Sequence, residues 1–348
     1  MQRAFEAAHA ARPELLHECD YAFGGRAVRI RIVGNSLAHH FLRPFAHLRL
    51  HEPLPAPPAA RFDFWDESET GIACPTSPPA PDDIPWPTDD GQFVAAADGR
   101  MIRYECPDAV TWLDRATGRV VGWRSAGAQL SIVERTRPMP YILPLWYQAA
   151  SLLVIHGALV ARGGKGIYFG GAGGAGKSTC ALSCLSAGLD YLSDDHIGLE
   201  ELSDGSFVGH SMFSSTRVEP DHLQRFSRLR EHGIASDHPT NYKSLVLLAE
   251  VLPERIRRQV AIDAVVVPRI VPRDDTAWRP ASKAETLRLI APTSLFMIPP
   301  KPGRDGFEKL ARLVESVPTF WLEIGRSLEA IPPRVNELFD TLETSPGA

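Results

Sequence analysis

The chain lacks any long hydrophobic run, and this shortage limits what it can be. Its 348 residues contain no uninterrupted apolar stretch of about 18, so we expect no membrane span and no membrane partner. Residues 1–20 carry acidic side chains early and lack the apolar core of a secretory signal. These absences predict a cytoplasmic protein.

The chain also has few cysteines and no excess of positive charge. The five cysteines include no C-x-x-C pair and no zinc-site spacing, so neither a disulfide framework nor a structural zinc is expected. Cys180 and Cys184 lie in a predicted helix and are interpreted as apolar filler in a reducing compartment. The 37 basic and 42 acidic side chains give a net charge of −5, so we expect no nucleic-acid partner.

Proline content and turn signals separate an N-terminal part. Residues 53–60 and 75–91 are rich in proline, which fixes φ and removes an amide donor. Short apolar runs surround these stretches, and Asp98-Gly99 is typical of a hairpin turn. We therefore expect a β-rich domain over residues 1–135. It shows no catalytic constellation, which favours a role in substrate recognition.

Strands and helices alternate from residue 136 to 348, which predicts an α/β domain. Pro144–Ile155 is apolar enough for a buried helix, and Pro220–His232 has the spacing of an amphipathic helix. Ile167–Phe169 and Leu189–Ser193 are predicted strands. A glycine-rich loop and a helix lie between them.

This glycine-rich loop carries the clearest signal in the chain. Its sequence GGAGGAGKST satisfies G-x-x-x-x-G-K-[ST], the P-loop pattern, in which backbone amides point together at the phosphates of ATP. The predicted nucleotide-binding residues are Gly171, Ala172, Gly173, Gly174, Ala175, Gly176, Lys177, Ser178 and Thr179. Lys177 would contact the β- and γ-phosphates, and the Ser178 hydroxyl would bind Mg²⁺. A flexible loop is the alternative, but the strand before it and the helix after it favour nucleotide binding.

Two adjacent aspartates follow the strand Leu189–Ser193. We expect Asp194 and Asp195 at the carboxyl edge of the sheet, where the phosphates would lie. One carboxylate can hold Mg²⁺ and the other can accept a proton from an attacking hydroxyl; the alternative is a solvated turn. His156 ends an apolar segment and is either a structural histidine or a partner that orients one of these carboxylates.

The run Ile155–Ile197 resembles the HPr kinase family, because a His-Gly, a P-loop, its helix and an Asp-Asp pair follow in the same order. The resemblance implies a P-loop kinase domain that acts on protein serine with ATP and Mg²⁺. Asp194 would be the base that takes the serine proton, and Asp195 would be linked to the metal together with Ser178. The catalytic residues implied are His156, Lys177, Asp194 and Asp195.

We therefore expect an ATP-dependent serine kinase that phosphorylates a protein or peptide hydroxyl. Similarity to kinases of lasso-peptide clusters implies the C-terminal serine of a precursor peptide as acceptor, and a homo-oligomer is expected. A small-molecule kinase and a non-catalytic ATP-binding regulator are alternatives on the same core. A carboxykinase-like enzyme would need a metal cluster of Lys, His and Asp that the sequence does not offer.

Overall fold

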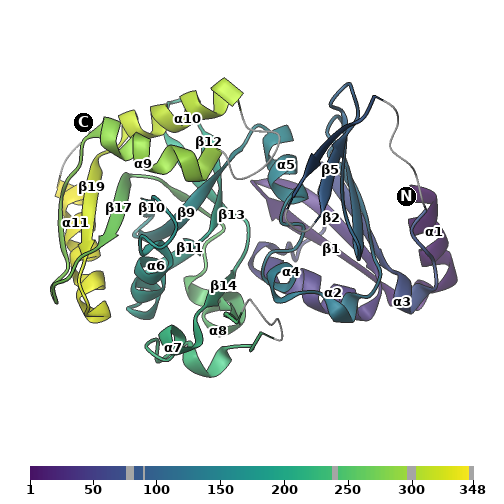
Figure 1. Ribbon diagram of the computed structural model, residues 1–348, viewed down its shortest axis with the longest axis horizontal. Coiled ribbons are helices and arrows are strands. Elements are labelled where there is room, and N and C mark those ends of the chain that lie inside the picture. The colour runs from purple at the N-terminus through teal and green to yellow at the C-terminus, as the bar shows by residue number, and fades with distance from the viewer. Residues whose placement is uncertain (76–81, 89–90, 237–241, 296–302, 345–348) are drawn as a thin grey trace. The chain divides into compact units, whose positions relative to one another are not determined.

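The computed structural model describes residues 1–75, 82–88, 91–236, 242–295 and 303–344, and it contains two compact units, Met1–Ser151 and Leu152–Ala348 (Figure 1). The boundary lies after Ser151 rather than near residue 135. The reason is Trp146, a buried side chain of α5 (Ile142–Ala149) that packs against Phe62 at 5.5 Å between ring centroids. Parts of the second proline-rich stretch lie outside the described residues.

The first unit is built on one mixed sheet, which confirms the expectation of a β-rich N-terminal part. Its strands are ordered β1-β2-β3-β8-β7-β6-β5-β4. Their bounds are β1 Leu16–Phe23, β2 Arg26–Val33, β3 Ala60–Asp66, β4 Ile84–Pro87, β5 Gln92–Ala95, β6 Met101–Cys106, β7 Ala109–Asp114 and β8 Arg119–Arg124. The predicted hairpin joins β5 to β6, where Gly99 takes φ +66°. The other helices are α1 Gln2–Ala11, α2 Asn35–Leu42, α3 Glu67–Thr70 and α4 Ile132–Thr136.

The second unit is an α/β domain around a mixed sheet. The strand order is β16-β13-β12-β9-β10-β17-β19-β18, and β11 also pairs with β9. These strands are β9 Leu153–Arg162, β10 Lys165–Gly170, β11 Asp190–Ser193, β12 His196–Glu201, β13 Phe207–Ser211, β16 Gln259–Ala261, β17 Ala264–Ile270, β18 Ala277–Pro280 and β19 Thr319–Ile324. A separate two-stranded ribbon pairs β14 (Ser215–Val218) with β15 (Ser244–Leu247).

Helices cover both faces of this sheet. On one face lie α6 Lys177–Ser186 and α11 Ile331–Thr344, and on the other lie α9 Lys283–Leu295 and α10 Gly303–Ser316. Two short helices, α7 Pro220–Leu223 and α8 Leu248–Val251, follow β14 and β15 in the chain. Side chains of β10 alternate between two apolar cores: Ile167 and Phe169 face the core with α6 and α11, while Tyr168 faces the core with α9 and α10. The expected α/β class is confirmed. In the described part of the chain, no helix is both long and apolar enough to cross a membrane.

Two predicted helices were wrong in extent. The apolar run Pro144–Ile155 changes from helix to strand: α5 ends at Ala149, Ser151 takes φ +67°, and β9 begins at Leu153. Both halves are buried, so hydrophobicity alone could not separate them. Pro220–His232 contains only α7 and a short 3₁₀ turn at Arg230–His232. Its apolar side chains still pack into the core between these turns.

Strand directions bring the predicted site residues to one edge of the sheet. β10 is antiparallel to β9, and β9 is antiparallel to β11, so β10 and β11 run the same way. Their carboxyl ends therefore lie at the same edge. Gly157 of β9 pairs with Gly170 of β10, which places His156 beside the start of the P-loop. His156 is also the register partner of His196 on β12.

Candidate functional site

The glycine-rich loop connects β10 directly to α6, as the P-loop pattern requires. Gly171 takes φ +132° and Gly176 takes φ +103°, a region that other residues rarely enter. A Cβ at Gly176 would also lie 2.5 Å from the Cδ1 atom of Ile324. The helix begins at Lys177, so its first free amides follow the loop at once. This arrangement suits an anion such as a phosphate.

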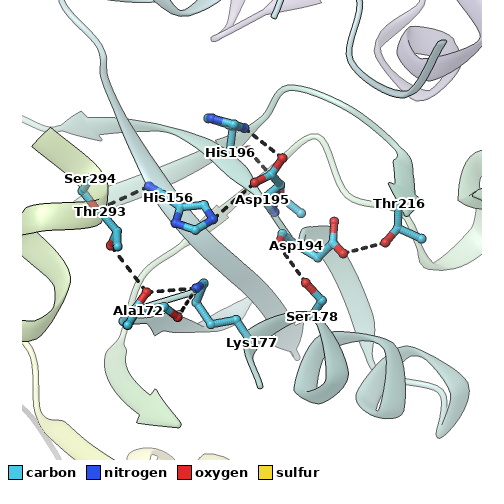
Figure 2. Close-up of polar contacts among 12 residues, drawn as sticks. His156, Ala172, Lys177, Ser178, Asp194, Asp195, His196, Thr216, Thr293 and Ser294 are labelled. Carbon is cyan, nitrogen blue, oxygen red and sulfur yellow. Dashed lines mark hydrogen bonds and ion pairs between the residues drawn. The ribbon is translucent and has the colours of Figure 1, made fainter. Parts of the chain in front are cut away.

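Lys177 is held over the loop. Its side chain is buried, and Nζ donates hydrogen bonds of 2.9 Å to the carbonyl oxygens of Gly171 and Ala172 (Figure 2). Burial lowers the pKa of the ammonium group, and the nearby carboxylates of Asp195 and Asp194 act in the opposite direction. The ammonium group therefore contacts the loop and is also within electrostatic range of the acidic pair.

Asp194 is a buried carboxylate with hydroxyl partners. Its side chain is 7% exposed, and Oδ2 accepts a hydrogen bond of 2.6 Å from Thr216 Oγ1. Burial raises the pKa of Asp194, and the charge of Asp195 adds to this; hydrogen bonding by hydroxyl groups, Thr216 first, opposes it. Ser178 Oγ donates to the main-chain oxygen of Asp194 at 3.3 Å. The fold thus brings the predicted base next to the P-loop serine.

Asp195 lies between two histidines. Its Oδ1 is 3.3 Å from His156 Nε2, and its Oδ2 is 3.2 Å from His196 Nδ1 (Figure 2). The main-chain nitrogen of His156 donates to Ser294 Oγ at 3.3 Å, which links this strand to α9. The structure therefore brings His156 next to Asp195, the second residue of the acidic pair.

Sequence reasoning missed several residues around this site. His196 directly follows the Asp-Asp pair, and this adjacency was a usable signal. Thr216 gave no such signal, because it reaches Asp194 only through the ribbon of β14 and β15. Thr293 donates from α9 to the Gly171 carbonyl at 3.4 Å, a contact between segments far apart in the chain.

A magnesium ion would find a small but suitable donor set here. Within the described ranges, no group of three or more His, Cys, Asp or Glu side chains is arranged around a metal position. Mg²⁺ needs no such cage, since it is usually held by one or two protein oxygens together with waters and substrate phosphates. Ser178 Oγ lies 3.3 Å from the main-chain oxygen of Asp194, and the carboxylate of the next residue, Asp195, is near enough to Lys177 to raise its pKa. The oxygens of Ser178 and Asp195 therefore suit such an ion.

Comparison with known proteins gives a local match. No protein-family model matches the chain. It is 33% identical over 87 residues to the HPr kinase/phosphorylase of Lachnoclostridium phytofermentans, which is 25% of this chain and 26% of that protein. The chain thus matches about a quarter of the length of this curated relative.

A comparison of folds finds the HPr(Ser) kinase/phosphatase from Coxiella burnetii. The TM-score is 0.32 at 15% sequence identity, over 55% of this chain and 92% of that one. Over the matched 87 residues, the chain is therefore similar in sequence to an HPr kinase/phosphorylase.

Proposed function

We propose that this protein is an ATP- and Mg²⁺-dependent kinase that transfers the γ-phosphoryl group to a serine hydroxyl of a protein or peptide. The proposal rests on the buried Asp194, whose main-chain oxygen accepts a hydrogen bond from Ser178 Oγ and whose carboxylate has the Ser178 hydroxyl among the groups that lower its pKa, at the start of the P-loop helix. A nucleotide-binding loop with a basic carboxylate at its γ-phosphate end suits phosphoryl transfer to a hydroxyl.

The residues take the following roles. The loop amides and Lys177 bind the phosphates, and Ser178 and Asp195 would hold Mg²⁺, which neutralises charge on the β- and γ-oxygens when bound. Asp194 orients the serine hydroxyl and accepts its proton as the new O–P bond forms. The bond between the γ-phosphorus and the β–γ bridging oxygen breaks, and ADP leaves. The raised pKa of Asp194 makes it a stronger base than an exposed aspartate.

The two histidines would keep Asp195 in place. His156 and His196 approach different oxygens of the carboxylate, so the group is restrained from both sides. Such restraint favours one orientation toward a metal ion at Ser178. His156 and Asp195 thereby support the transfer that Asp194 and Lys177 carry out.

For the acceptor, we propose the C-terminal serine of a precursor peptide, following the resemblance to kinases of lasso-peptide clusters. The first unit would recognise the polypeptide. None of the described cysteines forms a disulfide, which suits the reducing, cytoplasmic setting that we propose. We also propose that the protein acts as a homo-oligomer.

An acceptor panel tests this proposal. The protein would be incubated with Mg²⁺ and γ-labelled ATP and offered peptides that end in serine, the same peptides ending in alanine, and a set of hydroxylated metabolites. Label on serine-ended peptides alone is expected. Label on a metabolite would replace the proposal with a small-molecule kinase. ATP binding without transfer to any acceptor would favour a regulator.

A further inference from the structure

Two parallel strands, β17 and β19, lie on the side of the P-loop that faces away from the acidic pair. β10 has β9 as one neighbour and β17 as the other, and β19 follows β17 in parallel. The acidic pair directly follows β11, which pairs with β9 and so lies on the other side of β10. If the γ-phosphate faces Asp194, as the proposed function requires, the nucleoside end of the nucleotide extends toward β17 and β19.

An exposed isoleucine lies at that place. Ile270, the last residue of β17, is 69% exposed, the highest exposure recorded for a large apolar side chain in the described part of the chain. Its Cγ1 lies 3.9 Å from the position that a Cβ at Gly176 would take. Ile270 therefore flanks the last glycine of the P-loop and the first turn of α6.

The neighbouring arginines are engaged elsewhere. Arg269 and Arg273 both pair with Glu323, the latter at 2.7 Å, and Arg269 also lies over the Trp321 ring at 4.9 Å. Trp321 and Glu323 share one face of β19, and Ile324 lies on the other. The strand end thus offers the phosphate loop an apolar side chain rather than a free cation.

We infer that Ile270 is the surface on which the base of the bound nucleotide packs. Single exposed apolar side chains are common, so the position at the P-loop, not the exposure, carries the inference. The flat face of a nucleobase can cover such a side chain. Apolar packing of this kind does not distinguish the hydrogen-bonding groups of one base from those of another. Ile270 should therefore contribute equally to the binding of adenine and guanine nucleotides. This inference rests on the proposed function, since it takes the P-loop to bind a nucleotide.

The test compares binding of Mg·ATP, Mg·GTP and inorganic tripolyphosphate by calorimetry. The variants are Ile270→Ser, Ile270→Leu and, as a matched control, Leu202→Ser, which removes another exposed apolar side chain in the turn between β12 and β13. Ile270→Ser should weaken ATP and GTP binding about five- to tenfold and leave tripolyphosphate unchanged. Ile270→Leu and Leu202→Ser should bind like the unchanged protein.

Other outcomes separate this inference from the proposed function. Equal ATP affinity in Ile270→Ser and the unchanged protein would overturn the inference, and so would an equal loss for tripolyphosphate. Binding of tripolyphosphate as tightly as ATP by the unchanged protein would also overturn it, while phosphate binding by the loop would stand. Failure to bind any of the three ligands would overturn both.

Discussion

The contact between Thr216 and Asp194 gives the sharpest prediction about the site. Thr216 Oγ1 donates to Asp194 Oδ2 over 2.6 Å, and both side chains are buried, at 1% and 7% exposure. Thr216→Val keeps the shape of the side chain and removes the donor. A hydrogen bond to a charged group contributes about 1.5–3 kcal/mol, so we expect a loss of about 2 kcal/mol in the free energy of unfolding.

Thermal unfolding of the second unit shows this loss directly. For a unit of this size, about 2 kcal/mol corresponds to a fall in Tm of roughly 4–8 °C. Thr216→Ser is the control, because it keeps the hydroxyl and loses only a methyl group. The rate of phosphoryl transfer should fall in Thr216→Val as Asp194 loses its orientation, while ATP affinity stays constant.

A double-mutant cycle checks that the effect passes through Asp194. In an Asp194→Asn background, Thr216→Val should cost clearly less, because the charged acceptor is gone. If Thr216→Val is no more destabilising than Thr216→Ser, the hydroxyl does not stabilise the fold. If Thr216→Val lowers the free energy of unfolding equally with aspartate and with asparagine at position 194, the effect does not pass through the Asp194 charge.

Two further predictions concern other parts of the chain. Lys177→Ala removes the ammonium group held over the loop and should weaken ATP binding about 100-fold in calorimetry; an unchanged affinity would remove Lys177 from the phosphate site. Trp146→Ala deletes a buried ring that packs on Phe62 and should destabilise the first unit by about 3–5 kcal/mol in urea unfolding. A loss under 1 kcal/mol would show that α5 is not part of that core.

The loop, strand and helix that form the P-loop segment could be predicted from the sequence, because each depends on residues that are close together in the chain. The P-loop pattern, the strand before it and the helix after it depend on residues within one segment, and β10 and α6 lie where they were expected. The start of α9 depends on a contact of equally short range, since the Glu285 amide donates to Ser282 Oγ.

What the sequence did not reveal depends on contacts across the fold. Thr216 and Thr293 reach the site from a ribbon and a helix whose positions only the folded chain determines. The change from α5 to β9 was missed because both segments are equally apolar. The place of Ile270 beside Gly176 follows from the parallel pairing of β10 with β17, which no local pattern encodes.

Transfer of label from γ-labelled ATP to a serine-ended peptide, by the unchanged protein and by Asp194→Asn, shows whether the Asp194 carboxylate is the base of the reaction. The control is Asp204→Asn, which changes an exposed aspartate in the turn between β12 and β13. We expect phosphoserine with the unchanged protein and with Asp204→Asn, and a rate at least about 100-fold lower with Asp194→Asn at equal ATP affinity. Equal rates with and without the Asp194 carboxylate would show that Asp194 is not the base.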